Sequence, residues 1–236
     1  MAVDTKDSLA LQALPSITAS VLIGAAIYGA LVWAPTEKTM GFLQRIFYFH
    51  VSSGMAAMLA FITVFIGNIG YLTRRKAEWD WLALAGVEVG LTFTTIVLVT
   101  GSIWAKPAWG VWWVWDERLT SAFVLWVLYF TYLLLRRLIE NPERRAVISA
   151  VFGAFAFLDV PLVYFSIWWW RTQHPGPIIA RGDLPRDMLV AFFVSFSALT
   201  ALMVLMIWQR YKLEALRHTV EELQIEAGYR NEGGAK

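Results

Sequence analysis

The chain has 236 residues, of which 58% are hydrophobic, only 16% are charged and 13 are tryptophan. This is more apolar surface than one soluble domain can bury, so the composition is typical of a membrane protein. A net charge of +2 gives no reason to expect nucleic acid as a partner. Because the chain has no cysteine, disulfides, thiolate metal sites and cofactors attached through C-x-x-C-H are excluded.

Six apolar runs of about 20 residues, the length that crosses the hydrocarbon core of a bilayer, follow one another along the chain. They lie near 17–34, 47–72, 82–104, 119–139, 146–170 and 188–208. The first run is not typical of a cleaved signal peptide, because acidic residues flank it and no small-x-small site follows it. The sequence therefore predicts an all-α, polytopic membrane protein with a six-helix membrane domain over 1–210.

The orientation of the spans follows from the lysines and arginines in alternate connections. The segments that share a side with the two termini carry 13 of these residues, and the connections on the other side carry seven. The rule that positive residues stay inside therefore predicts cytoplasmic termini. Residues 211–236 then form a cytoplasmic tail, in which Leu213, Leu216, Val220 and Leu223 have the spacing of an amphipathic helix.

The outward-facing connection after the third span contains the stretch W-G-V-W-W-V-W-D-E-R-L-T-S, from Trp109 to Ser121. Its tryptophans would cover most of the circumference of a helix, so they do not form one core-facing stripe. The outer side as a whole carries nine of the 13 tryptophans, whereas an interfacial belt would divide them more evenly. We expect an aromatic surface about 104–120 that serves a ligand, with these residues: Trp109, Trp112, Trp113, Trp115, Asp116 and Arg118.

Two histidines, His50 and His174, are predicted to lie on the same face as the tryptophans, whereas His218 lies in the tail. Two imidazoles can fill both axial positions of the iron in a flat macrocycle, and tryptophans provide an apolar wall for its edge. The sequence fits a zinc site less well, because two histidines leave the tetrahedral ligand set of zinc incomplete. Side chains that could bind the carboxylates of such a macrocycle are Arg45, Arg118, Arg171 and Lys106.

Two acidic residues lie within predicted spans, where a carboxylate is a functional candidate by default. Glu88 lies between Gly86 and Gly90, a small-x-x-x-small pair that permits close helix packing, and we expect it to be mainly structural. Asp159 precedes Pro161, which is expected to kink the fifth span. The sequence names no partner for Asp159, so a structural role and a proton or ligand role both stay open.

The stretch W-G-V-W-W-V-W-D-E-R-L-T-S resembles the tryptophan-rich "WWD" signature of membrane haem-handling proteins, and the resemblance extends over all six spans. R-I-F-Y-F-H-V and W-W-W-R-T-Q-H-P, which contain His50 and His174, resemble the two histidine motifs of the haem exporter protein C family of bacterial cytochrome c maturation. The resemblance implies a multi-pass protein of the bacterial inner membrane. It also implies b-type, non-covalent, transient haem at the periplasmic face, with both histidines as axial ligands.

The same resemblance implies the partners and the task of the chain. Proteins of this kind present haem to a membrane-anchored haem chaperone, protein E, and assist its covalent attachment to that chaperone without being enzymes themselves. They act beside ATP-binding-cassette subunits A and B and a small protein D, and this chain has no G-x-x-x-x-G-K-[ST] phosphate loop of its own.

Other functional classes remain possible from the sequence. A b-type membrane cytochrome for electron transfer would commonly hold haems near both sides of the membrane, whereas the inner half offers no histidine pair. A haem lyase-like relative would usually have more spans and further histidines. A scaffold subunit would use the aromatic face only to pack against a partner.

Overall fold

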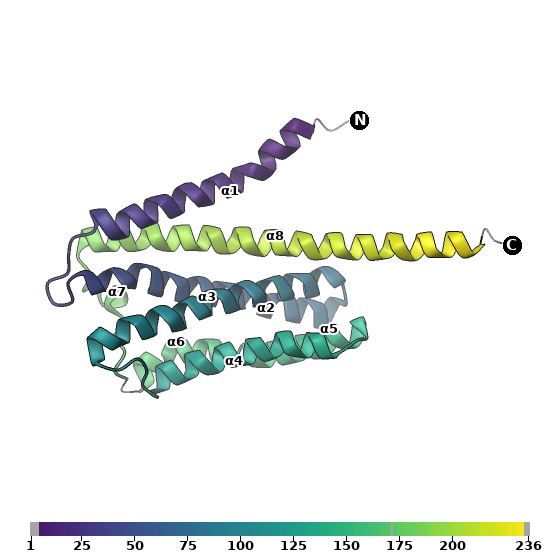
Figure 1. Cartoon of the computed structure of the whole chain (residues 1–236). Helices are drawn as coiled ribbons and strands as arrows, with labels where there is room; N and C mark the ends of the chain where they lie inside the picture. Colours follow the sequence, from purple (N-terminus) through teal and green to yellow (C-terminus); the bar gives the residue numbers. More distant parts are fainter. Residues whose placement is uncertain (1–4, 171, 234–236) are drawn as a thin grey trace.

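The computed structural model describes residues 5–170 and 172–233 as a bundle of long helices joined by short connections (Figure 1). Helices satisfy every backbone hydrogen bond within the segment, as a lipid environment requires. Within the described residues, six segments are long and apolar enough to cross a membrane, so the predicted spans are confirmed. The helices are α1 (Thr5–Tyr28), extended by a π-helical turn (Gly29–Trp33), a 3-10 turn (Phe42–Arg45), α2 (Ile46–Arg74), α3 (Ala77–Trp109), α4 (Glu117–Leu138), α5 (Pro142–Ala156), α6 (Asp159–Trp169), α7 (Ile178–Arg181) and α8 (Arg186–Gly233).

The helices form three groups, with α2 and α3 between α1 and α8 on one side and α4 to α6 on the other (Figure 1). The beginning of α1 and the end of α8 extend toward the same end of the bundle. The connection between α3 and α4 and the connection between α6 and α8 lie at the other end, which we call the site end. Large apolar side chains remain exposed around the bundle, among them Val21, Ile66, Val99 and Phe155, as expected for a surface that faces lipid.

The central pair α2 and α3 packs closely because glycines remove side chains at the contact. A Cβ on Gly86 would lie 2.8 Å from Val64 Cγ2, and one on Gly90 would lie 2.6 Å from Phe61 Cε1. The predicted close approach at this glycine pair is therefore confirmed. Phe61 in turn stacks on Tyr129 of α4 with ring centres 4.0 Å apart, so the α2–α3 pair also anchors the third group of helices.

The fifth span is broken between α5 and α6, as Pro161 predicts. A proline at this position cannot donate to the carbonyl of Phe157, and that carbonyl instead accepts from Val160 N at 3.0 Å. The tighter turn ends one helix and begins the next at Asp159. Asp159 Oδ2 is buried, and no hydrogen-bond partner for it is present among the described residues.

Ion pairs connect the helices at the end opposite the site. Arg136 of α4 donates to both carboxylate oxygens of Asp80 on α3, at 2.6 and 2.8 Å, and both side chains are largely buried. Arg210 of α8 lies between Glu88 of α3 and Glu214, with Nη2 to Oε1 distances of 3.0 and 2.5 Å. Glu88 thus has an ion-pair partner on another helix, in keeping with the structural role expected of it.

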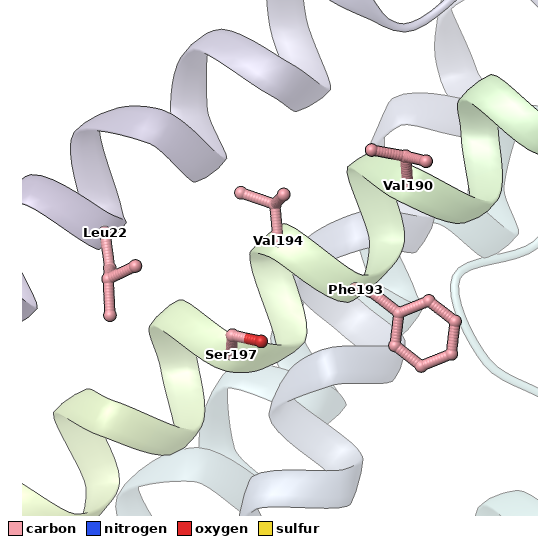
Figure 2. A pocket seen from close by; sticks show the side chains of 5 residues that line it. All are labelled: Leu22, Val190, Phe193, Val194 and Ser197. Carbon is pink, nitrogen blue, oxygen red and sulfur yellow. The ribbon is translucent and has the colours of Figure 1, made fainter.

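The outermost pair, α1 and α8, diverges toward the end opposite the site (Figure 1). Between them lies a shallow apolar groove whose residues are shown in Figure 2: Leu22 from α1 and Val190, Phe193, Val194 and Ser197 from α8. Helix α8 continues without interruption beyond residue 210, so the predicted tail extends the last membrane helix. In this extension, Leu216, Val220 and Leu223 are each more than half exposed.

Candidate functional site

The tryptophan-rich stretch forms the turn between α3 and α4. Helix α3 ends at Trp109, and Gly110 follows with a φ of 79°, a left-handed conformation that favours glycine. Residues 111–116 then run without helical structure to α4. Within this segment Trp112 and Trp115 are 59% and 73% exposed, so the predicted aromatic surface is present at the site end.

Other tryptophans support this surface from behind. Trp113 is half-buried and packs edge-on against Trp115 and Phe123, with ring centres 5.6 and 6.3 Å away. Trp109 packs edge-on against Trp104 one turn earlier in α3, at 5.2 Å. Trp115 therefore rests on Trp113 and Phe123 instead of projecting from a free loop.

Asp116 begins α4 and joins the tryptophan segment to the connection after α6. Its Oδ1 accepts from Leu119 N at 2.8 Å, the usual N-cap contact. Its Oδ2 accepts from the hydroxyl of Thr172 and from Gln173 N, the latter at 3.1 Å. His174 N donates to Thr172 Oγ1 at 3.0 Å, so one carboxylate holds two connections that are 56 residues apart in the chain.

His50 lies on α2, one turn after the beginning of this helix at Ile46. Its Nδ1 is 3.0 Å from Thr100 Oγ1 of α3. The Thr100 hydroxyl donates to Ile96 O at 2.6 Å, so its lone pairs are available to accept from Nδ1–H. A Cβ on Gly101 would lie 3.1 Å from His50 Cε1, so the ring is held against the backbone of α3.

His174 lies in the connection after α6. Its Nδ1 is 2.9 Å from Pro175 O, which can only accept, so Nδ1 carries the proton. Burial, and to a smaller extent the nearby charge of Arg118, lowers the pKa of His174 to about 4. The imidazole is therefore neutral at pH 7, the form in which histidine binds metals.

The two imidazoles are neighbours in space. Their ring centres are 6.2 Å apart and their planes are inclined by 31°. Metal–nitrogen bonds of about 2 Å, with each ring centre about 1 Å behind its nitrogen, would separate two axial imidazoles by roughly 6 Å. Because Nδ1 of each ring is engaged, Nε2 is the nitrogen available for a metal on both sides. In the described part of the chain no cluster of three His, Asp or Glu side chains suitable for a metal is found.

The cationic residues predicted to bind the carboxylates of the macrocycle differ in the contacts that they make. Arg118 lies in the first turn of α4 and donates from Nη1 to Val163 O of α6 at 3.0 Å. The guanidinium of Arg45 lies 4.9 Å from the ring centre of Phe42, and its Nε is buried without a hydrogen-bond partner among the described residues. Lys106 donates to Gly110 O at 2.9 Å and so caps α3. Arg171 lies outside the described residues.

Sequence reasoning missed Thr100 and Thr172, which contact the two histidines, and the link from Asp116 to the His174 connection. Thr100 begins the run T-G-S in an otherwise apolar span, and Thr172 is two residues before His174. Polar residues at such places could have been identified as candidates. The hydrogen-bond partners of Thr100 and Thr172 could not have been identified, because these partners lie 50 and 56 residues away in the chain.

Comparison with known proteins gives one family and many relatives. Residues 5–226 match the family model described as "Heme exporter protein C". The chain is 31% identical to heme exporter protein C of Bradyrhizobium diazoefficiens over 92% of this chain and 84% of the relative. It is 32% identical to heme exporter protein C of Escherichia coli K12, over 83% and 82% of the two chains. It is 31% identical to a putative cytochrome c biosynthesis ccmC-like mitochondrial protein of Marchantia polymorpha, over 75% and 76%.

Proposed function

The chain belongs to the heme exporter protein C family, and from this premise we propose that it binds haem at the periplasmic face of the inner membrane and delivers it to a membrane-anchored haem chaperone. Membership of the family makes it a membrane component for transport or handling, and not an enzyme. The bound haem is b-type, non-covalent and transient in this proposal. It is the cargo of the protein, with an iron that accepts two axial nitrogen ligands.

The observation that carries the proposal is the pair of imidazoles with ring centres 6.2 Å apart. His50 and His174 would bind the iron through Nε2, and the hydrogen bonds at Nδ1 would fix the tautomer and the orientation of each ring. Two neutral imidazoles fill both axial positions, which leaves no open position on the iron for oxygen.

The tryptophan surface would hold the edge of the macrocycle and meet the chaperone. Indole rings stack on flat aromatic molecules, and tryptophan is enriched among the residues that contribute most of the binding energy in protein interfaces. Trp112 and Trp115 are both exposed, and Trp115 rests on Trp113, so both indoles are accessible to a flat ligand and to a partner. Arg45, Arg118 and Arg171 are the proposed partners of the propionates, since guanidinium groups bind carboxylates through two hydrogen bonds.

We further propose that the chain works with the ATP-binding-cassette subunits A and B and the small protein D of the maturation system. The charge distribution supports cytoplasmic termini, which puts the extended end of α8 on the side where such ATPases act. The covalent attachment of haem to chaperone protein E would then take place beside the tryptophan surface, with this chain presenting the haem.

The test is to purify the protein with its bound haem and compare it with His50→Ala, His174→Ala and the double variant. Haem content and the absorption spectrum should change in each single variant and haem should be largely lost in the double variant. His218→Ala is the matched control, because His218 lies against Trp81 and Glu222 near the opposite end. Unchanged haem content and spectrum in the double variant would overturn the proposal.

The same preparations separate the proposal from a b-type cytochrome. A carrier should lose its haem to added chaperone, whereas an electron-transfer protein should keep it and be reduced rapidly by quinol. Of the histidines, the opposite end holds only His218 within the described residues, so no second pair is placed to hold another haem there.

A further inference from the structure

The two imidazoles of the proposed haem site are held in different ways. His50 is part of a 29-residue helix, and its ring is supported by Thr100 and Gly101 of the closely packed neighbouring helix. His174 is in a non-helical connection, and the one hydrogen bond of its ring within the described residues goes to the carbonyl of the next residue, Pro175. A local contact of this kind moves with the loop, so it does not fix the ring relative to the helices.

The carboxylate of Asp116 attaches the part of this connection around His174 to α4. Thr172 and Gln173 both donate to Asp116 Oδ2, and Thr172 in turn accepts from His174 N. Asp116 is also the N-cap of α4 and directly follows Trp115, the most exposed tryptophan of the aromatic surface. The aromatic surface and the His174 ligand are therefore joined through one side chain.

We propose that Asp116 and Thr172 are positioning residues that hold His174 on the iron, and that haem release begins by separation of the His174 connection from Asp116 while His50 stays bound. A protein that docks on Trp112 and Trp115 would displace the backbone at Trp115–Asp116 and break this Asp116–Thr172 link. The inference rests on the proposed function and names the ligand through which transfer is controlled.

The chemistry of the link makes this separation reversible and selective. The link consists of two hydrogen bonds to one carboxylate at a partly exposed position, so water can replace both. The His50 ring has no comparable route out, because it belongs to α2, which packs against α3 at glycines where even a Cβ would have no room. Release of one axial ligand before the other also gives the incoming chaperone an open position on the iron.

The experiment compares Thr172→Val, Asp116→Asn and Thr100→Val in the haem-loaded full-length protein. Thr172→Val removes the hydroxyl with little change of shape. Asp116→Asn retains an N-cap oxygen but can no longer accept both from Leu119 and from the His174 connection. Thr73→Val, at the far end of α2, is the matched control, since the Thr73 hydroxyl donates to backbone carbonyls of its own helix.

The first readout is the rate at which haem passes to excess apomyoglobin. Outer hydrogen-bond partners of metal ligands typically change affinity by roughly 10- to 100-fold, so we expect Thr172→Val and Asp116→Asn to release haem at least about tenfold faster. The second readout is the absorption spectrum, which should show partial loss of the six-coordinate form. Added imidazole should restore that form and Thr172→Ser should restore the slow rate, neither of which a general loss of stability would permit.

The outcomes separate the inference from the function on which it rests. If the double histidine variant loses haem but Thr172→Val and Asp116→Asn keep the original spectrum and release rate, the link is not a control point. A faster release from Thr100→Val than from Thr172→Val would also overturn the inference, because His50 would then be the ligand that leaves first. If the double histidine variant keeps its haem, the proposed function fails as well.

Discussion

The two ends of the bundle use charge in opposite ways. At the end opposite the site, Arg136 and Arg210 are paired with carboxylates of neighbouring helices. At the site end, Arg118 donates to a backbone carbonyl and Arg45 has a buried Nε without a partner among the described residues. The difference teaches that carboxylates of a neighbouring helix neutralise buried guanidinium groups at one end. At the other end, within the described residues, Arg45 and Arg118 have no carboxylate in an ion pair and share that end with two neutral imidazoles, which favours an anionic ligand.

The largest effect on stability is expected from breaking the buried ion pair between Arg136 and Asp80 at the end opposite the site. Asp80→Leu leaves the guanidinium of Arg136 buried without its carboxylate, and loss of one partner of such a pair costs about 3–5 kcal/mol. Thermal unfolding in detergent should show a large decrease in Tm. The fraction that remains folded should keep its haem spectrum, and an unchanged Tm would contradict the distinction between the two ends.

A smaller effect, confined to transfer, is expected from the tryptophan surface at the site end. Trp112→Ala and Trp115→Ala each remove an exposed indole, and a central interface tryptophan contributes about 2 kcal/mol or more to binding. Affinity for the chaperone, measured by titration with the haem-free chaperone, should fall by more than about tenfold. Trp208→Ala, on α8 away from this surface, is the control, and equal weakening by all three variants would exclude a docking role.

The position of the His50 ring can be disturbed without substituting His50 itself. Gly101→Ala would bring a Cβ within 3.1 Å of His50 Cε1, so the imidazole must shift by a few tenths of an ångström. Because such a shift misaligns an axial ligand, haem affinity should fall by about tenfold or less, with a visible change in spectrum. Gly24→Ala adds the same methyl group where nothing lies within 4 Å, and it should leave the spectrum unchanged.

The pKa of His174, lowered to about 4, predicts how haem binding depends on pH. The folded protein disfavours the charged imidazole, so the neutral ligand persists as the pH falls through the ordinary value of about 6.5. Haem retention should stay constant from pH 8 to about 5 and fall near pH 4. The same shift makes the folded state bind fewer protons than the unfolded state, so stability of the haem-free protein should decrease from pH 6.5 to 4. Loss of haem with a midpoint near 6.5 would contradict this environment for His174.

The smallest effect is expected from breaking the more exposed ion pair between Arg210 and Glu88 at the end opposite the site. Glu88 is about one third exposed at 35%, so solvent screens its attraction to Arg210. Arg210 also keeps a second partner in Glu214. Glu88→Gln should therefore reduce stability by no more than about 1 kcal/mol, and a decrease in Tm as large as that of Asp80→Leu would refute the ranking.

Much of the fold follows directly from the sequence because lipid imposes simple rules on length and polarity. The predicted span 47–72 corresponds to Phe42–Arg74, and 146–170 corresponds to Pro142–Trp169 with the expected break before Pro161. Charge and hydropathy also predict that His50 and His174 share one end with the tryptophans, and the structure brings their ring centres to 6.2 Å.

The hydrogen-bond partners of these residues were not predictable in the same way. Asp116 looks like an ordinary N-cap in sequence, and its second oxygen reaches Thr172 only through the packing of α4 against α6. The partner of Glu88 is 122 residues away on α8. Periodicity and charge counting describe single helices and their ends, so contacts of this kind require the arrangement of the helices in space.

The most direct test of the central claim is the electron paramagnetic resonance spectrum of the protein loaded with ferric haem. If Nε2 atoms of His50 and His174 both bind the iron, the spectrum should be low-spin and typical of two axial imidazoles, and it should become largely high-spin in His50→Ala and in His174→Ala. A low-spin spectrum that is identical in the original protein and in the double variant would contradict the account.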